Sequence, residues 1–147
     1  MNEEPDVRAL LESLKDVFDK ENKSQEFDEE REIYVILLPK LIIELSSAYK
    51  IVDAIAIGST ASIWKVQDVS LDRPRALKLT RPRLGKEEDV VIIVRTEAKT
   101  MSALSHNNIL EIFTAGEIVL EQQCYKFPYI LMDFMPGIQD FDEYIVG

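Results

Sequence analysis

The chain has 147 residues, a formal net charge of −10 and a single cysteine. That length allows one ordinary hydrophobic core, so we expect one domain with an extension. The acidic balance argues against nucleic-acid binding, and one cysteine excludes an intramolecular disulfide. The most apolar run, residues 33–45, contains Pro39, Lys40 and Glu44 and is too short to span a bilayer. We therefore expect a cytoplasmic protein that binds neither nucleic acid nor a membrane.

An acidic helical extension is predicted over residues 1–48. Its first 32 residues hold twelve acidic and five basic side chains, a balance of −7. Apolar side chains spaced by three and four residues from Pro5 to about Lys20 predict an amphipathic helix. The polar stretch that follows, residues 21–29, is predicted to be a loop.

The second predicted helix runs from residue 28 or 29 to residue 46 or 47. A kink is expected at Pro39, because a proline ring clashes with the preceding turn. Apolar residues occupy most of the circumference of this helix. Such a helix is either buried by the first helix and the core, or it is a binding surface for another chain. We favour burial.

Beyond residue 48 the pattern changes from helix to strand. In the first strand Ile51, Ile55 and Ile57 should share a face. The second and third strands are joined by residues 71–74, and Gly116 could interrupt the fourth. A helix is expected from about residue 86 to residue 104, so the chain is of the α+β class. The strands are predicted over residues 49–57, 62–69, 75–80, 110–119 and 123–133.

Lys78 is the residue that points most directly to chemistry. It stands in the middle of an apolar strand, where a charged amine is costly unless a partner or an anionic ligand meets it. Glu97 lies downstream on the apolar side of the predicted helix, so the two residues are expected to form an ion pair. The pair either fixes an amine against a ligand or only joins the strand to the helix.

Four pieces of sequence follow one another in a specific order. A turn with Gly58 precedes the strand around Lys78, and the helix with Glu97 leads to His106-Asn107-Asn108-Ile109 and then to a strand ending in Met132-Asp133-Phe134-Met135. In this order residues 49–147 resemble the N-terminal lobe (N-lobe) of the protein kinase family, of the serine/threonine type, ending at the hinge and the start of the C-terminal lobe (C-lobe). The resemblance implies a five-stranded antiparallel sheet with one long regulatory helix.

The resemblance also implies ATP as the ligand. Lys78 would contact the α and β phosphates while Glu97 orients it. Met132 would be the gatekeeper at the back of the adenine pocket, and the backbone of Asp133 and Met135 would bond the adenine edge. The remaining implied residues sandwich the adenine ring (Ile57, Ile63 and Ala76) or form the turn over the phosphates (Gly58, Ser59 and Thr60).

Two departures from the family pattern affect the expected activity. The turn has Gly58 alone where the family has three glycines, with Thr60 at the second position, so nucleotide binding is expected to be loose or unusual. The chain has no His-Arg-Asp-x-x-x-x-Asn or Asp-Phe-Gly segment, so the Mg²⁺ ligands and the catalytic base are not in it. We expect it to be inactive alone, to need a C-lobe or partner protein, and to self-associate through exposed apolar surface.

Two other functions are consistent with the same residues. A small-molecule kinase of the same superfamily would share Lys78 and Glu97. A non-catalytic, pseudokinase-like module would instead bind a partner through the helix at residues 33–45, in line with the degenerate glycine turn. The basic run at residues 73–86 has six basic side chains and no acidic one, and we expect it to be a solvated face rather than a phosphate-binding patch.

Overall fold

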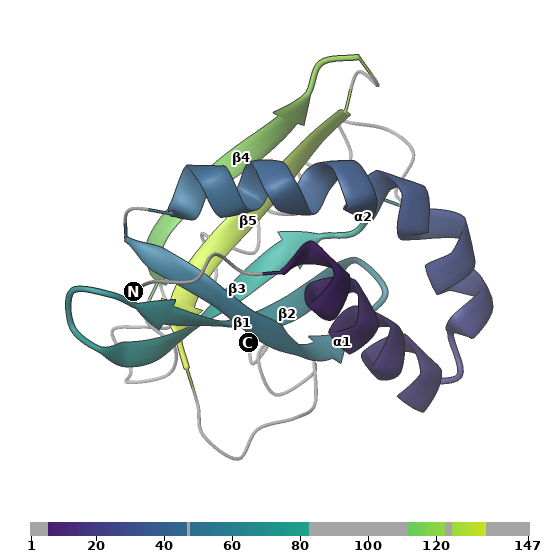
Figure 1. The fold of residues 1–147 in the computed structure, drawn as a ribbon, viewed down its shortest axis with the longest axis horizontal. Coiled ribbons are helices and arrows are strands. Elements are labelled where there is room, and N and C mark those ends of the chain that lie inside the picture. Colours follow the sequence, from purple (N-terminus) through teal and green to yellow (C-terminus); the bar gives the residue numbers. More distant parts are fainter. Residues whose placement is uncertain (1–5, 47, 83–111, 123–124, 135–147) are drawn as a thin grey trace.

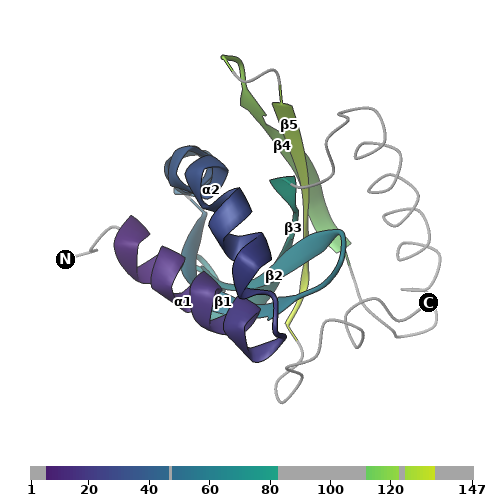
Figure 2. The same ribbon diagram turned by 90° about the vertical axis from the view of Figure 1, so that its right-hand side faces the viewer.

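The computed structural model describes residues 6–46, 48–82, 112–122 and 125–134. Two helices precede five strands, which form one antiparallel sheet in the order β1-β2-β3-β5-β4. Figure 2 shows both helices on one side of this sheet. The predicted α+β class, with two helices before a five-stranded antiparallel sheet, is confirmed. The elements are α1 (Val7–Lys20), α2 (Ser24–Leu45), β1 (Tyr49–Ile57), β2 (Ala61–Asp68), β3 (Arg73–Thr80), β4 (Ile112–Leu120) and β5 (Tyr125–Asp133).

The loop predicted between the helices is wrong over most of its length. Helix α2 begins at Ser24, and only Glu21–Lys23 separate it from α1. The turn is closed by Asn22, which has a φ of 58°, and by the Lys23 N–H, which donates to the Phe18 carbonyl at 2.9 Å. Polar residues continue the helix here because Phe27 packs on Phe18, with ring centroids 5.4 Å apart. A buried aromatic pair thus anchors a segment that otherwise has the composition of a loop.

Helix α2 buries one side and exposes part of the other. The favoured burial is confirmed for the inward side, where Leu37, Leu38 and Leu41 have no exposed surface. On the outward side Ile43 is 74% exposed and Val35 is 40% exposed. Pro39 lies inside the helix, which continues from Ser24 to Leu45. Figure 1 shows the helix axis bending toward its darker, Ser24 end and not in the part that leads into β1, so the expected kink at Pro39 is not seen. Neither described helix is long and apolar enough to cross a membrane.

The helices and the sheet share one hydrophobic core. Leu14 and Phe18 of α1 and Leu37 of α2 belong to the same buried cluster as Trp64 and Leu77 of the sheet. This face of the sheet is therefore covered by the residues that the sequence assigns to an extension. The division at residue 48 stays a prediction.

Strand β1 departs from regular alternation at two places. Ile51, Ala54 and Ile57 face the helices, whereas the sequence predicted Ile55 in place of Ala54. The register with β2 shifts between Ile51 and Asp53 and again between Ala54 and Ala56. Each shift inserts an unpaired residue and turns the following side chains to the other face. Ser13 of α1 stabilises the irregular strand, because its hydroxyl accepts from the Ala54 N–H at 2.9 Å.

The predicted connection at residues 71–74 is also too late in the chain. Strand β3 begins at Arg73, and the turn before it is held by the Asp68 carboxylate. Asp68 accepts from the Ser70 hydroxyl at 3.0 Å and from the Leu71 N–H at 3.1 Å. The Leu71 N–H is the main cause of the lowered pKa of Asp68, and Ser70 and Arg75 lower it further. The turn is therefore closed by the carboxylate of Asp68, which precedes the predicted connection.

Strand β4 is continuous at Gly116, where the sequence allowed a break. Gly116 pairs with Tyr129 of β5, and the irregularity lies between Ile112 and Thr114 instead. A Cβ atom at Gly116 would lie 2.6 Å from the Tyr129 hydroxyl oxygen. The glycine is needed here for a close side-chain approach and not for a turn.

Replacing Tyr129 with phenylalanine should flatten the loss of stability at alkaline pH. The Tyr129 hydroxyl donates to Glu44 of α2 at 2.9 Å, and burial, followed by this carboxylate, raises the pKa of Tyr129 to about 12. An unfolded tyrosine has a pKa of about 10, so the bond stabilises the fold fully below pH 10 and is lost as the pH rises through about 12. Unfolding free energies from pH 8 to 12, with ultraviolet spectra of the phenolate, measure the effect. Equal pH profiles for the two proteins would contradict this assignment.

Candidate functional site

The sheet face opposite the helices gathers four of the predicted ligand residues, Ile63, Ala76, Lys78 and Met132. Side chains alternate along a strand, so Ile63 and Lys78 lie on the face opposite Trp64 and Leu77, which belong to the core under the helices. Lys78 is 3% exposed and pairs in register with Ile63 of β2 and with Ile130 of β5. A charged amine is thus held in the middle of an apolar sheet face.

Ala76 and Met132 complete this face on the hinge side of Lys78. Ala76 of β3 is the register partner of Met132 of β5, and both are fully buried. With Ile63 they form an apolar surface beside the Lys78 amine. One of the three side chains is small, one is unbranched and one is branched. Apolar side chains beside an amine have the chemistry to recognise a ligand with an apolar ring and an anionic group. The four residues come from three neighbouring strands, whose pairing fixes their positions.

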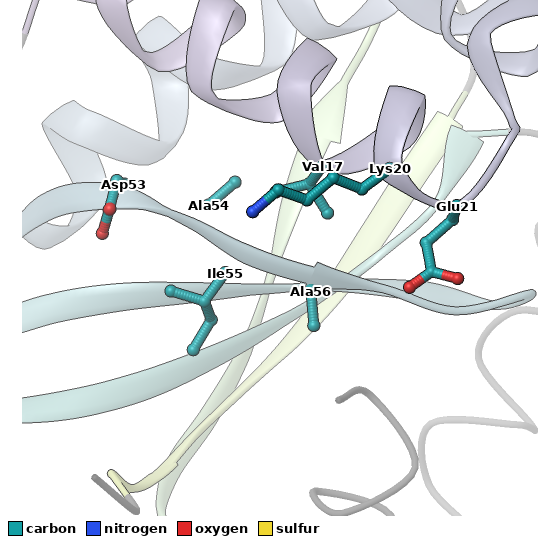
Figure 3. A pocket seen from close by; sticks show the side chains of 7 residues that line it. All are labelled: Val17, Lys20, Glu21, Asp53, Ala54, Ile55 and Ala56. Atoms are coloured by element: carbon teal, nitrogen blue, oxygen red, sulfur yellow. The ribbon is translucent and has the colours of Figure 1, made fainter. Parts of the chain in front are cut away.

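Ile57 lies on the other face, in the core under the helices. Ala56 occupies the position that was predicted for Ile57 beside the ligand residues, since Ala56 is the register partner of Ile63. Figure 3 shows Ile55 and Ala56 pointing away from the helices and Ala54 pointing toward α1, at a pocket of about 250 Å³ under the end of α1. The bulge between Ala54 and Ala56 shifts the pairing of β1 with β2 by one residue, so Ala56 and not Ile57 lies opposite Ile63. Sequence reasoning missed Ala56 because no residue type marks a bulge of this kind.

The turn between β1 and β2 is tight. The Gly58 N–H donates to the Ala61 carbonyl at 2.9 Å, which leaves Ser59 and Thr60 as the turn residues. Ser59 is exposed and Thr60 is half-buried. Because the Gly58 amide is already bonded, this turn offers phosphate fewer backbone donors than a loop with three glycines. The hydroxyl groups of Ser59 and Thr60 are side-chain donors at the same turn.

Arg81 is a site residue that the sequence did not single out. It follows β3 and has no exposed surface, and its guanidinium contacts Glu30 of α2 and the carbonyl of Gly58. The expectation that the basic run is solvated is wrong for three of its members, because Arg75 and Lys78 are also buried. These three basic residues lie in or next to the central strand β3, where burial is decided by the sheet and not by the local charge.

The hinge end of the sheet carries a second buried arginine. Arg75 of β3 is the register partner of Asp133 of β5, and its Nη1 lies 3.3 Å from the Asp133 carboxylate. Its Nε lies 3.5 Å from the carboxylate of Asp68. The pair with Arg75 engages the Asp133 side chain, so the role predicted for this residue depends on its backbone alone.

Several predicted residues lie outside the described residues. They include Glu97, Met135, the helix at residues 86–104 and residues 106–109 of the turn after it. The Lys78–Glu97 ion pair therefore stays a prediction. Among the residues that the structure describes, no three histidine, cysteine, aspartate or glutamate side chains are grouped so as to hold a metal ion.

Curated bacterial serine/threonine-protein kinases are similar to this chain over a small share of their own length. No family model matches the chain. Serine/threonine-protein kinase PrkC of Bacillus subtilis is 33% identical over 70% of this chain and 15% of its own length. PknB of Mycobacterium leprae is 29% identical over 63% of this chain, and PksC of Streptomyces coelicolor is 34% identical over 60%.

These similarities extend over only a small share of each relative. The chain spans only about 15% of the length of the curated relatives that it matches. Such a short matched region is consistent with an N-lobe fragment, and the described sheet has the five antiparallel strands that the resemblance implies. The matches and the sheet together show that this part of the chain is similar to the N-lobe of serine/threonine protein kinases.

Proposed function

We propose that this lobe binds ATP as the nucleotide-binding part of a serine/threonine protein kinase. The observation that carries the proposal is the position of Lys78, a buried amine at an apolar sheet face beside Ala76 and Met132. An ammonium fixed in a site of low polarity attracts phosphate more strongly than one in water. The adjoining apolar surface suits the adenine ring.

Each residue of the site has a role in this proposal. Glu97 orients the Lys78 amine toward the α and β phosphates. Ile63 and Ala76 contact the adenine ring together with Ala56, and Met132 closes the back of the pocket. The backbone of Asp133 and Met135 bonds the adenine edge. The turn of Gly58, Ser59 and Thr60 covers the phosphates with few backbone donors, which favours weak binding.

Phosphoryl transfer needs groups that this chain is not expected to supply. A kinase uses Mg²⁺ ions and a catalytic base to neutralise and orient the reacting phosphoryl group. In this proposal those residues belong to a C-lobe or to a partner protein that completes the site, and the chain alone is inactive. The complete protein acts in the cytoplasm, where the ATP pool lies.

A second candidate function is a non-catalytic interaction module. The outward side of α2 favours it, because Ile43 is 74% exposed and Val35 and Ile36 lie in the same helix with over a third of their surface exposed. Apolar side chains in such positions are typical of a surface that binds another chain. A module of this kind needs no nucleotide, so nucleotide binding separates the two functions.

ATP should raise the melting temperature of the chain, and Lys78→Met should abolish this shift. A ligand that binds only the folded state stabilises it by RT ln(1 + [L]/Kd), so the shift should grow with ATP concentration through the millimolar range. The methionine keeps the length and apolar stem of the lysine but removes its charge. Differential scanning fluorimetry with and without ATP is the measurement.

The matched control is Lys50→Met at the exposed start of β1. It removes one positive charge from the same sheet and should leave the ATP shift unchanged. A wild-type chain whose melting temperature is the same at every ATP concentration would favour the interaction module. A shift that survives in Lys78→Met would show that nucleotide binds elsewhere.

A further inference from the structure

We propose that Arg81 is a positioning residue for the turn between β1 and β2, and that helix α2 sets the shape of this turn through it. The inference rests on the proposed function, because the turn is the part of the site that would cover the nucleotide phosphates. It assigns to the two N-terminal helices a role in regulating that site, beyond their contribution to the core.

Arg81 binds the turn on both sides. Its Nη1 donates to the Gly58 carbonyl at 2.6 Å, and its backbone N–H donates to the Thr60 carbonyl at 2.9 Å. The two carbonyls flank Ser59, so one residue at the end of β3 fixes both ends of the short segment that faces solvent. A turn held in this way has little freedom to move toward or away from a ligand.

Helix α2 in turn fixes the guanidinium of Arg81. The Nε donates to Glu30 Oε1 at 3.2 Å and the Nη2 to Glu30 Oε2 at 2.5 Å, which is a bidentate pair. The Nη2 also donates to Glu26 at 2.8 Å, and the guanidinium lies 5.0 Å from the centre of the Phe18 ring. A planar guanidinium with a bidentate partner has one orientation. The direction in which Nη1 meets Gly58 is therefore set by the helices.

The charges of this cluster also matter for an anionic ligand. Two carboxylates close to the turn would repel phosphate if they were not neutralised. Burial alone lowers the pKa of Arg81, but hydrogen bonds and charges from Glu30 and Glu26 more than offset it and leave the pKa raised. Arg81 therefore remains a cation and screens the phosphate side from Glu30. A displacement of α2 would change the shape of the turn and its local charge together.

Arg81→Lys tests the proposal because it keeps the positive charge and removes the planar guanidinium that makes the bidentate pair. Native-state hydrogen exchange should show the amides of Gly58 and of residue 81, which are bonded within the turn, exchanging about tenfold faster relative to the Leu77 amide at the centre of β3. The affinity of the variant for ATP should fall as well. Glu26→Gln, at a residue that is 28% exposed, is a milder second variant with the same expected direction.

Arg75→Lys is the matched control for the exchange measurement. Arg75 is a second buried arginine with two carboxylate partners, at the other end of β3, so its loss should destabilise the chain without changing the exchange of Gly58 relative to Leu77. Unchanged relative exchange in both Arg81→Lys and Glu26→Gln would overturn the proposal. Faster exchange with an unchanged ATP affinity would overturn the link to the nucleotide. A wild-type chain that does not bind ATP would overturn the proposed function, and the exchange result would still decide whether Arg81 holds the turn.

Discussion

Replacing Arg81 with methionine should lower the free energy of unfolding by about 3–5 kcal/mol, the usual cost of removing one partner of a buried ion pair. The variant leaves the carboxylate of Glu30, whose side chain is 4% exposed, inside the protein without its cation. It also removes the donor to the Gly58 carbonyl. Urea denaturation followed by circular dichroism measures the change. Both proteins are compared with the same slope of unfolding free energy against urea concentration.

The double variant Glu30→Met/Arg81→Met separates the cost of a lone charge from the worth of the pair. Apolar replacement of both members of a buried pair is often close to neutral, so the double variant should recover a large part of the lost stability. Lys15→Met removes an exposed pair with Asp19 and should leave the unfolding free energy unchanged. An Arg81→Met variant as stable as the wild type would show that the buried pair contributes nothing net.

The sequence could not reveal this network because its partners are distant along the chain. Arg81 lies in a run of basic residues, a pattern typical of a solvated face. Its carboxylate partners are separated from it by 51 and 55 positions, in a helix whose polar start was predicted to be a loop. Local charge patterns do not show which acidic residue a helix will turn inward. Only the packing of α2 on the sheet brings the three side chains together.

The elements with strong local patterns were predicted well. Strand β1 has the predicted bounds, Tyr49–Ile57, and the position of Lys78 in a buried strand followed from its apolar neighbours alone. The face of β1 was predicted wrongly at Ile55, because two bulges interrupt the alternation on which such a prediction depends. The same bulge places Ala56 on the face predicted for Ile57. Strand existence is thus a local property, whereas the face of each side chain depends on the partner strand.

Removing residues 1–48 should abolish cooperative folding of residues 49–147. Helices α1 and α2 cover Leu77, Leu79 and Leu131, which have no exposed surface in the whole chain. Exposing three such leucines costs about 1.5–3 kcal/mol each, comparable with the whole stability of an ordinary domain, about 5–15 kcal/mol. We therefore expect the shortened chain to show no cooperative thermal transition by circular dichroism.

The fluorescence of Trp64, the chain's only tryptophan, gives an independent measure of the same truncation. Trp64 lies on the covered face and is fully buried, with its indole N–H donating to Ser62 at 2.8 Å. Its emission should move to the red in the shortened chain and stay unchanged when only residues 1–5, which precede α1, are removed. Cooperative unfolding of residues 49–147 at the wild-type temperature would instead support the division at residue 48 that the sequence predicts. Loss of cooperative unfolding would mean that the core of the lobe includes the N-terminal helices. Retention would mean that these helices are only an extension attached to the lobe.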